Sequence, residues 1–197
     1  MNLTMPAAAG SISEFEWRTF TPFQRALLVN DGTVTKLIEA YTLEAVEVVR
    51  LKQETQLLSS AHTWLKTPPD TEVIAREVVL RARHSSTVYA YAVSLLVPAR
   101  LPAGLLNDLA SEPGGLGQVL LNSRIENRRE ILWCGREQVT DPPEAIRELT
   151  GVDFISRTYR IIAGGQPVML IDEKFPANGM RVASRESPFQ PYRGGTV

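Results

Sequence analysis

The chain has 197 residues, of which 44% are hydrophobic and 22% are charged, and its 21 basic and 22 acidic side chains leave a formal net charge of −1. This length predicts one domain with a sizeable core. The near-neutral charge excludes the global basic field that drives nonspecific binding to nucleic acids or anionic membranes. We therefore expect neither partner, and we expect a monomer.

Cysteine content and hydropathy indicate the compartment. Cys134 is the only cysteine, which excludes an intrachain disulfide and a multi-thiolate metal site. Residues 1–10 lack the basic start of a secretory signal, and no run approaches the roughly 18 apolar residues of a membrane span. These features predict a cytoplasmic protein.

The two ends of the chain are predicted to lie outside the folded domain. Residues 1–14 predict a flexible leader, and residues 184–197, which are rich in proline and glycine, predict a flexible tail. This leaves one domain over residues 15–183.

The first half of that domain predicts two helices and then three strands. Thr21 provides an N-cap and Pro22 the first helical residue, Asp31 and Gly32 end this helix, and a second begins near 33–35. Valine-rich runs with the period of a strand follow at 45–57, 73–83 and 87–97. The short polar connection between the last two predicts antiparallel neighbours.

The second half repeats this order with one small inserted helix. Asp141 as N-cap and Gly151 as terminator bound the inserted helix, and Gly164–Gly165 permits a two-residue hairpin turn. The other predicted elements are helices at 102–110 and 116–122 and strands at 125–135, 155–163 and 166–175. Segregated runs of helices and strands predict an α+β fold with one largely antiparallel six-stranded sheet, and the near-repeat suggests duplication.

Arg76 is an unusual residue in its strand. It shares a face with Ile74, Val78 and Leu80, because side chains of like parity point to one side. An unpaired guanidinium among apolar neighbours is costly, so a protein carboxylate or an anionic ligand should meet it. A structural ion pair or an edge-strand position is the alternative.

The final strand carries two carboxylates among apolar residues. Parity places Glu173 with Met169 and Ile171, and Asp172 on the other face. An apolar wall favours the protonated form of a carboxylate, which suits a general acid. A two-residue turn places Arg160 opposite Met169 on the Glu173 face, so a structural salt bridge between Arg160 and Glu173 is the alternative.

Other polar features point to less specific roles. The glycines of 114–117 precede a short helix whose free N–H groups can receive an anion, but an ordinary helix start explains them as well. His62 and His84 are too far apart for a metal set, and Cys134 reads as a buried apolar residue. The basic residues Arg124, Arg128 and Arg129 alternate with acids and indicate a solvated face.

Several short segments, in order, carry a family resemblance. They are Asp31-Gly32-Thr33-Val34-Thr35-Lys36, Arg76-Glu77-Val78-Val79-Leu80, Gly115-Leu116-Gly117, and Tyr159 to Pro167 leading to Glu173-Lys174-Phe175. Over about residues 25–177 the chain resembles the chorismate pyruvate-lyase family, which makes 4-hydroxybenzoate and pyruvate from chorismate. It is more similar to the cyanobacterial and mycobacterial branch than to the enterobacterial one.

The resemblance implies a site and a reaction. Arg76 would bind the ring carboxylate, Leu116 would offer its backbone N–H to it, and Glu173 would lie near the ring oxygen as the acid or base. Val34 and Thr35 would line the lid side. The family chemistry needs no metal, nicotinamide or covalent nucleophile. A second cation is needed for the enolpyruvyl carboxylate, and either Arg160 or Lys36 would supply it.

Two other functions are compatible with the same pattern. The family fold also resembles the effector-binding domains of GntR-type regulators, so a non-catalytic domain that binds aromatic carboxylates is the alternative. The roughly 20 residues before the first helix are too short for a helix-turn-helix, which favours the enzyme. In an inactive homologue, Arg76 and Glu173 would neutralise each other or other partners.

Overall fold

A computed structural model describes residues 16–111, 115–123, 125–138, 142–149 and 151–179. In these residues the chain forms four α-helices, three short 3₁₀ segments and six strands. The α-helices are α1 (Pro22–Val29), α2 (Val34–Thr42), α3 (Ala103–Ser111) and α4 (Gly115–Asn122), and the 3₁₀ segments are η2 (Trp17–Thr19), η3 (Pro98–Arg100) and η4 (Glu144–Leu149).

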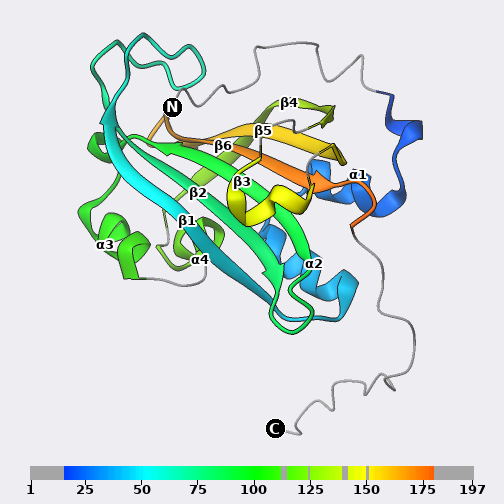
Figure 1. The fold of residues 1–197 in the computed structure, drawn as a ribbon. Coiled ribbons are helices and arrows are strands. Elements are labelled where there is room, and N and C mark those ends of the chain that lie inside the picture. The colour runs from blue at the N-terminus through cyan, green and yellow to red at the C-terminus, as the bar shows by residue number, and fades with distance from the viewer. Residues whose placement is uncertain (1–15, 112–114, 124, 139–141, 150, 180–197) are drawn as a thin grey trace, which may run out of the picture.

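All six strands form one antiparallel sheet, as predicted. The strands are β1 (Val46–Leu57), β2 (Glu72–Ala82), β3 (Val88–Leu96), β4 (Asn127–Gln138), β5 (Asp153–Ala163) and β6 (Gln166–Pro176). Their spatial order is β1-β2-β3-β6-β5-β4, so the two three-strand meanders meet where β3 pairs with β6. This order agrees with the near-repeat in the sequence and makes the β3–β6 pair the centre of the sheet (Figure 1).

The β5–β6 hairpin has the predicted turn and an unexpected bulge. Gly164 and Gly165 both have positive φ, 56° and 77°, which suits the tight turn that glycine favours. Ala163 faces Gln166 across the turn, but the register shifts between Ile161 and Ile162. Every partner of β5 beyond this bulge is displaced by one residue from the simple hairpin count.

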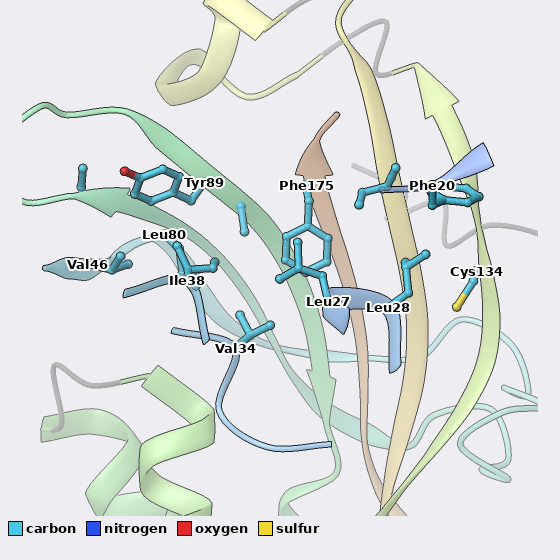
Figure 2. Packing of buried hydrophobic residues seen from close by; sticks show 13 residues of the cluster. Phe20, Leu27, Leu28, Val34, Ile38, Val46, Leu80, Tyr89, Cys134 and Phe175 are labelled. Atoms are coloured by element: carbon cyan, nitrogen blue, oxygen red, sulfur yellow. The ribbon is translucent and has the colours of Figure 1, made fainter. Parts of the chain in front are cut away.

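The α-helices cover one face of the sheet. Leu27 and Leu28 of α1 and Ile38 of α2 are fully buried in a cluster with Phe175 of β6, and Figure 2 shows these side chains gathered beside the strands. Apolar residues of α3 and α4 form a second cluster with β5 and β6, which includes Leu105, Leu109, Val119, Leu120, Ile161 and Met169. Two helix pairs on one face thus leave room between them for a site.

The opposite face is covered by irregular segments. Ile146 of η4 is fully buried against Val79, Tyr91 and Val93, and η4 lies across the sheet away from the α-helices (Figure 1). Leu65, in the long connection from β1 to β2, packs there with Leu95 and Leu170. Both faces of the central strands are therefore buried.

The capping signal of the first helix is confirmed, whereas the predicted inserted helix is only a kinked 3₁₀ segment that begins at Glu144. Thr21 accepts from the Gln24 backbone N–H at 3.2 Å and the Gln24 side chain accepts from the Thr21 N–H at 3.0 Å, which forms a capping box. Asp141, the leader at 1–14 and the tail at 184–197 lie outside the described residues. None of the described helices has the length and apolar composition needed to cross a membrane.

Candidate functional site

A cavity of about 70 Å³ lies between the sheet and the N-terminal ends of α2 and α4. A single water needs roughly 10–15 Å³ by the same kind of measure, so several waters or part of a small organic molecule fit inside. The lining consists of Gly32, Val34, Thr35, Val48, Arg76, Val78, Leu80, Ala92, Ser94, Gly115, Leu116, Gly117, Arg129, Tyr159, Ile171 and Glu173.

Arg76 lies in the cavity wall on β2 and is only 4% exposed. Its Nε is buried and has no hydrogen-bond partner among the described residues. Burial, and secondarily the nearby charge of Arg50, lowers the pKa of the Arg76 guanidinium. A buried guanidinium without a counter-ion is costly unless an anion joins it, so the position of Arg76 suits the binding of an anion.

Glu173 lies on β6 in the same cavity, with both carboxylate oxygens engaged. Its Oε2 accepts from Nε of Arg157 at 2.8 Å and lies 2.7 Å from Nη2, and its Oε1 accepts from the Tyr159 hydroxyl at 3.1 Å. Two nitrogens of one guanidinium thus converge on a single carboxylate oxygen in a charge-assisted contact, and the Tyr159 hydroxyl occupies the other oxygen. Glu173 is therefore held in a fixed orientation.

Arg157 links this carboxylate to the helix layer. It is 1% exposed, and its Nη1 donates to the backbone carbonyl of Asn30, the residue after α1, at 2.6 Å. Burial is the largest single influence and lowers the pKa of Arg157, but the charge and hydrogen bond of Glu173 together with Tyr159 and Cys134 outweigh it, so the net shift is upward. Arg157 is thus the permanent counter-ion of Glu173.

Tyr159 packs between the charged groups of the site. The Arg157 guanidinium carbon lies 4.9 Å from the centre of its ring, within the range of a cation–π contact. Burial and the neighbouring Glu173 raise the pKa of the Tyr159 hydroxyl. Tyr159 therefore serves Glu173 as a neutral hydrogen-bond donor.

Two glycines let the helix ends approach closely. Gly115 has a φ of 75°, and a Cβ there would lie 3.2 Å from a methyl carbon of Val48. A Cβ on Gly117 would lie 3.4 Å from the Thr33 side chain, just before α2. This packing puts the first backbone N–H groups of α4, which have no partner inside the helix, beside the cavity.

The predicted site residues are not all in one place. Arg76, Glu173, Leu116, Val34 and Thr35 come together in the lining. Lys36 is exposed on α2 and is not among the lining residues.

The predicted position of Arg160 is wrong. At the register shift β6 carries an extra residue, Val168, which places Arg160 opposite Leu170 instead of Met169, so Arg160 and Glu173 lie on opposite faces of the sheet. There it donates to Glu130 at 3.0 Å and to the Trp64 carbonyl at 2.9 Å. The same shift puts Arg157 opposite Glu173, where the simple count places Ser156.

Sequence reasoning missed two arginines of the cavity region. Strand parity places Arg157 on one face with the apolar residues Ile155 and Ile161, and this pattern could have identified it. The residue count across the hairpin turn instead placed Arg160 on the Glu173 face. Arg129 lines the cavity from β4, and its Nε is buried without a hydrogen-bond partner in the part of the chain that the structure describes. The alternation with acidic residues predicted a solvated face for the whole cluster. Alternate residues of a strand point to opposite faces, however, so the exposed neighbours of Arg129 do not predict where Arg129 itself points.

Other candidate sites are weaker. A larger cavity of about 250 Å³ lies under α1, but no side chain in its lining carries a formal charge. His62, His84 and Cys134 belong to neither lining, and burial raises the pKa of the Cys134 thiol to about 11. The described residues hold no group of three histidine, cysteine, aspartate or glutamate side chains placed for a metal ion.

The geometry defines what this site can do. Arg76 can fix a carboxylate at one side of an enclosed cavity, and Glu173 presents an oriented carboxylate to the same space. Val34, Val78, Leu80 and Ile171 supply apolar walls for a small ring. This arrangement suits a small cyclic carboxylate and a proton transfer on it.

Comparisons with known proteins agree with this description. A family model described as "Chorismate pyruvate-lyase Rv2949c-like" matches residues 28–182. A "Chorismate pyruvate-lyase" from Mycobacterium tuberculosis is 30% identical over 187 residues, which cover 90% of this chain and 91% of the relative. One from Mycobacterium leprae is 26% identical over 182 residues, which cover 89% and 84%.

Solved structures share the fold at low sequence identity. The effector domain of PhnF from Mycobacterium smegmatis superposes with a TM-score of 0.58 at 11% identity and covers 79% of this chain and 94% of that domain. A putative GntR-family transcriptional regulator has a TM-score of 0.54 at 19% identity, with 79% and 64% covered. These likenesses confirm the fold class expected from the sequence.

Proposed function

The chain belongs to the Rv2949c-like chorismate pyruvate-lyase family, and from this premise we propose that it converts chorismate into 4-hydroxybenzoate and pyruvate. Membership confirms the resemblance identified in the sequence. The observation that carries the proposal is the buried, unpartnered guanidinium of Arg76 in one cavity with the oriented carboxylate of Glu173.

The reaction is an elimination that needs no external oxidant or reductant. The hydrogen on the ring carbon beside the ether-bearing carbon leaves as a proton, and its electron pair completes the aromatic ring. The bond between the ring and the ether oxygen breaks, and the released enolpyruvate takes up a proton to become pyruvate. The enzyme has only to orient the substrate, exclude water and manage protons.

Arg76 and the N-terminus of α4 are assigned to the ring carboxylate. A planar guanidinium binds a carboxylate through two parallel hydrogen bonds, and the Leu116 N–H is among the first amides of α4 that lack a partner inside the helix. Val34 and Thr35 close the cavity on the α2 side. The ring is thereby held against Val78 and Ile171.

Glu173 is assigned the proton transfer. Arg157 supplies the counter-ion for its charged form and Tyr159 donates to its other oxygen, so the carboxylate is presented to the cavity as an acceptor. In this assignment Glu173 takes the ring proton as a general base and returns it to solvent or to the leaving enolpyruvate. Arg157 and Tyr159 are positioning residues that act through Glu173.

The alternative is a domain that binds an aromatic carboxylate without reaction. Its support is the fold shared with the effector domain of PhnF and the putative GntR-family regulator. The inactive homologue, in which Arg76 and Glu173 would neutralise each other or other partners, is compatible with Glu173 but not with Arg76. The partner of Glu173 is Arg157, and the structure pairs Arg76 with no carboxylate in the residues it describes.

The direct test is to incubate the purified protein with chorismate, without added metal or cofactor, and to quantify 4-hydroxybenzoate and pyruvate by chromatography. We expect equal amounts of both, well above an enzyme-free control. Tight binding of 4-hydroxybenzoate without turnover of chorismate would overturn the lyase proposal and support the non-catalytic binding domain. We further propose, from the sequence, a cytoplasmic monomer that needs no cofactor.

Arg76→Ala tests the binding assignment within the same assay. We expect the affinity for 4-hydroxybenzoate to fall by about 30-fold or more, because the ligand carboxylate loses a buried charged partner. Isothermal titration measures this affinity. Arg160→Ala is the matched control, because Arg160 lies on the other face, and unchanged affinity in Arg76→Ala would remove Arg76 from the site.

A further inference from the structure

Arg129 is a second cation of the cavity that has no carboxylate partner in the described part of the chain. Its side chain lines the cavity, and its buried Nε donates to no group among the residues that the structure describes. The neighbouring carboxylate of Glu130 does not compensate it, since Glu130 contacts Arg160 at 3.0 Å and Arg128 at 3.8 Å. Arg129 therefore resembles Arg76 in having a desolvated donor that a ligand could satisfy.

The charge balance of the lining indicates a ligand with two negative charges. Three lining residues carry a formal charge, namely Arg76, Arg129 and Glu173. Arg157 already neutralises Glu173 from behind the wall, so the charges of Arg76 and Arg129 remain uncompensated. Buried charges are stabilised by opposite charges, and a dianion supplies two.

The sheet register separates the two arginines. Arg76 pairs with Ser94, Ser94 with Ile171, and Ile171 with Tyr159, so these four residues form one row across β2, β3, β6 and β5. Arg129 lies one strand further, on β4 opposite Ile161. Four steps between neighbouring strands amount to about 19 Å between the two backbones in a flat sheet.

Each arginine therefore approaches the cavity from its own side, as the positions of β2 and β4 on either side of the central strands show (Figure 1). Glu173 on β6 lies between them. The Arg129 guanidinium carbon is 5.6 Å from the centre of the Tyr159 ring, a contact that holds the side chain over the row. Such a separation suits two carboxylates at different ends of one ligand.

We propose that Arg129 binds the enolpyruvyl carboxylate of chorismate, while Arg76 binds the ring carboxylate. This inference rests on the proposed function and names a substrate-binding residue for it. It replaces Lys36 and Arg160 as sources of the second cation. It also predicts discrimination between substrate and product, because 4-hydroxybenzoate keeps only the carboxylate assigned to Arg76.

The test compares one dianion with one monoanion. Arg129→Gln keeps much of the side-chain volume and removes the charge, and Arg160→Gln is the matched control on the opposite face. Chorismate affinity is measured by isothermal titration in a Glu173→Gln background to slow turnover, and kcat/KM is measured with Glu173 intact. Both variants are also titrated with 4-hydroxybenzoate, which is the monoanion.

We expect Arg129→Gln to weaken chorismate binding and lower kcat/KM by about 30-fold, and to change 4-hydroxybenzoate affinity less than twofold. Arg129→Lys, which restores the charge, should recover part of the loss, and Arg160→Gln should change neither affinity. Equal loss for both ligands, or no loss for chorismate, would overturn the assignment.

The proposed function fails by a different result. If chorismate binds the wild-type protein without conversion, the lyase proposal is overturned, and the comparison of the two ligands still decides the role of Arg129. If chorismate does not bind the wild-type protein, both proposals are overturned.

Discussion

Asp172 and Glu173 are adjacent on β6 but belong to different environments. Both are buried, at 2% and 9% exposure, and each contacts a cation. Asp172 accepts from the Thr158 hydroxyl at 2.7 Å and contacts Lys174 at 2.7 Å on the face covered by irregular segments. Glu173 lies with Arg157 on the helix-covered face and lines the cavity.

The difference between these carboxylates shows what distinguishes a site from a structural network. Lys174 also contacts Glu137, so the Asp172 side is a chain of alternating charges in which each group has a partner. The Glu173 side opens on a cavity with two arginines whose Nε atoms lack partners among the described residues. A buried carboxylate alone did not reveal the site, whereas unpartnered cations beside a cavity did.

The largest difference between the two carboxylates should appear in turnover when each is replaced by its amide. Glu173→Gln should lower turnover by about 10²- to 10⁴-fold, because the proposed general base is lost, while 4-hydroxybenzoate still binds. Asp172→Asn should keep turnover near the wild-type value. Steady-state kinetics and product titration measure both, and similar turnover in the two variants would remove the functional distinction.

The second effect concerns the cations on the two faces. Arg157→Ala should lower the free energy of unfolding by about 3–5 kcal/mol, because it leaves the buried Glu173 without its counter-ion. Arg160→Ala should cost about 1 kcal/mol or less, since its partner Glu130 is 37% exposed. Urea unfolding monitored by circular dichroism tests this, and equal losses would contradict the contrast in burial.

The smallest effect is the pH dependence of the Asp172 network. Burial raises the pKa of Asp172, and Lys174 and Thr158 only partly offset this. A raised pKa in the folded state means that the folded protein binds the proton more tightly, so stability falls as pH rises from about 4 through the folded pKa. Asp172→Asn lacks this titration.

We therefore expect the wild-type protein to lose stability relative to Asp172→Asn as pH increases across that window. Urea unfolding of both proteins at several pH values from 4 upward measures the difference. A difference that is constant with pH, or that grows in favour of the wild type, would contradict the assigned direction.

Much of the fold could be predicted because its signals are local. The capping box at Thr21, the paired glycines at 164 and 165, and the valine-rich runs each act within a few residues. The positions of Arg76 and Glu173 on apolar faces also follow from strand parity alone. These features fixed the element order and two members of the candidate site.

The failure at Arg160 came from a feature without a local signal. Opposite the step from Ile161 to Ile162, β6 carries an extra residue, Val168, so the register shifts by one, and a shift of one reverses which side chains of the two strands share a face. Pro167 lies beside the extra residue, and proline within a strand is found at bulges as well as at edges and strand starts, so its presence does not by itself specify a bulge. Arg157 therefore lies on the Glu173 face, where the residue count across the turn had placed Arg160.

The sequence by itself determined the fold class, the faces of Arg76 and Glu173 and the family, because periodicity, caps, turns and short ordered motifs are properties of the chain in order. Only the tertiary structure decided which charges meet. Arg157 contacts Glu173 across the hairpin and the backbone carbonyl of Asn30, more than 120 residues away in the sequence. Arg129 of β4 lines the same cavity as Arg76 of β2. Such pairings depend on register and on sheet order, which chain neighbours do not specify.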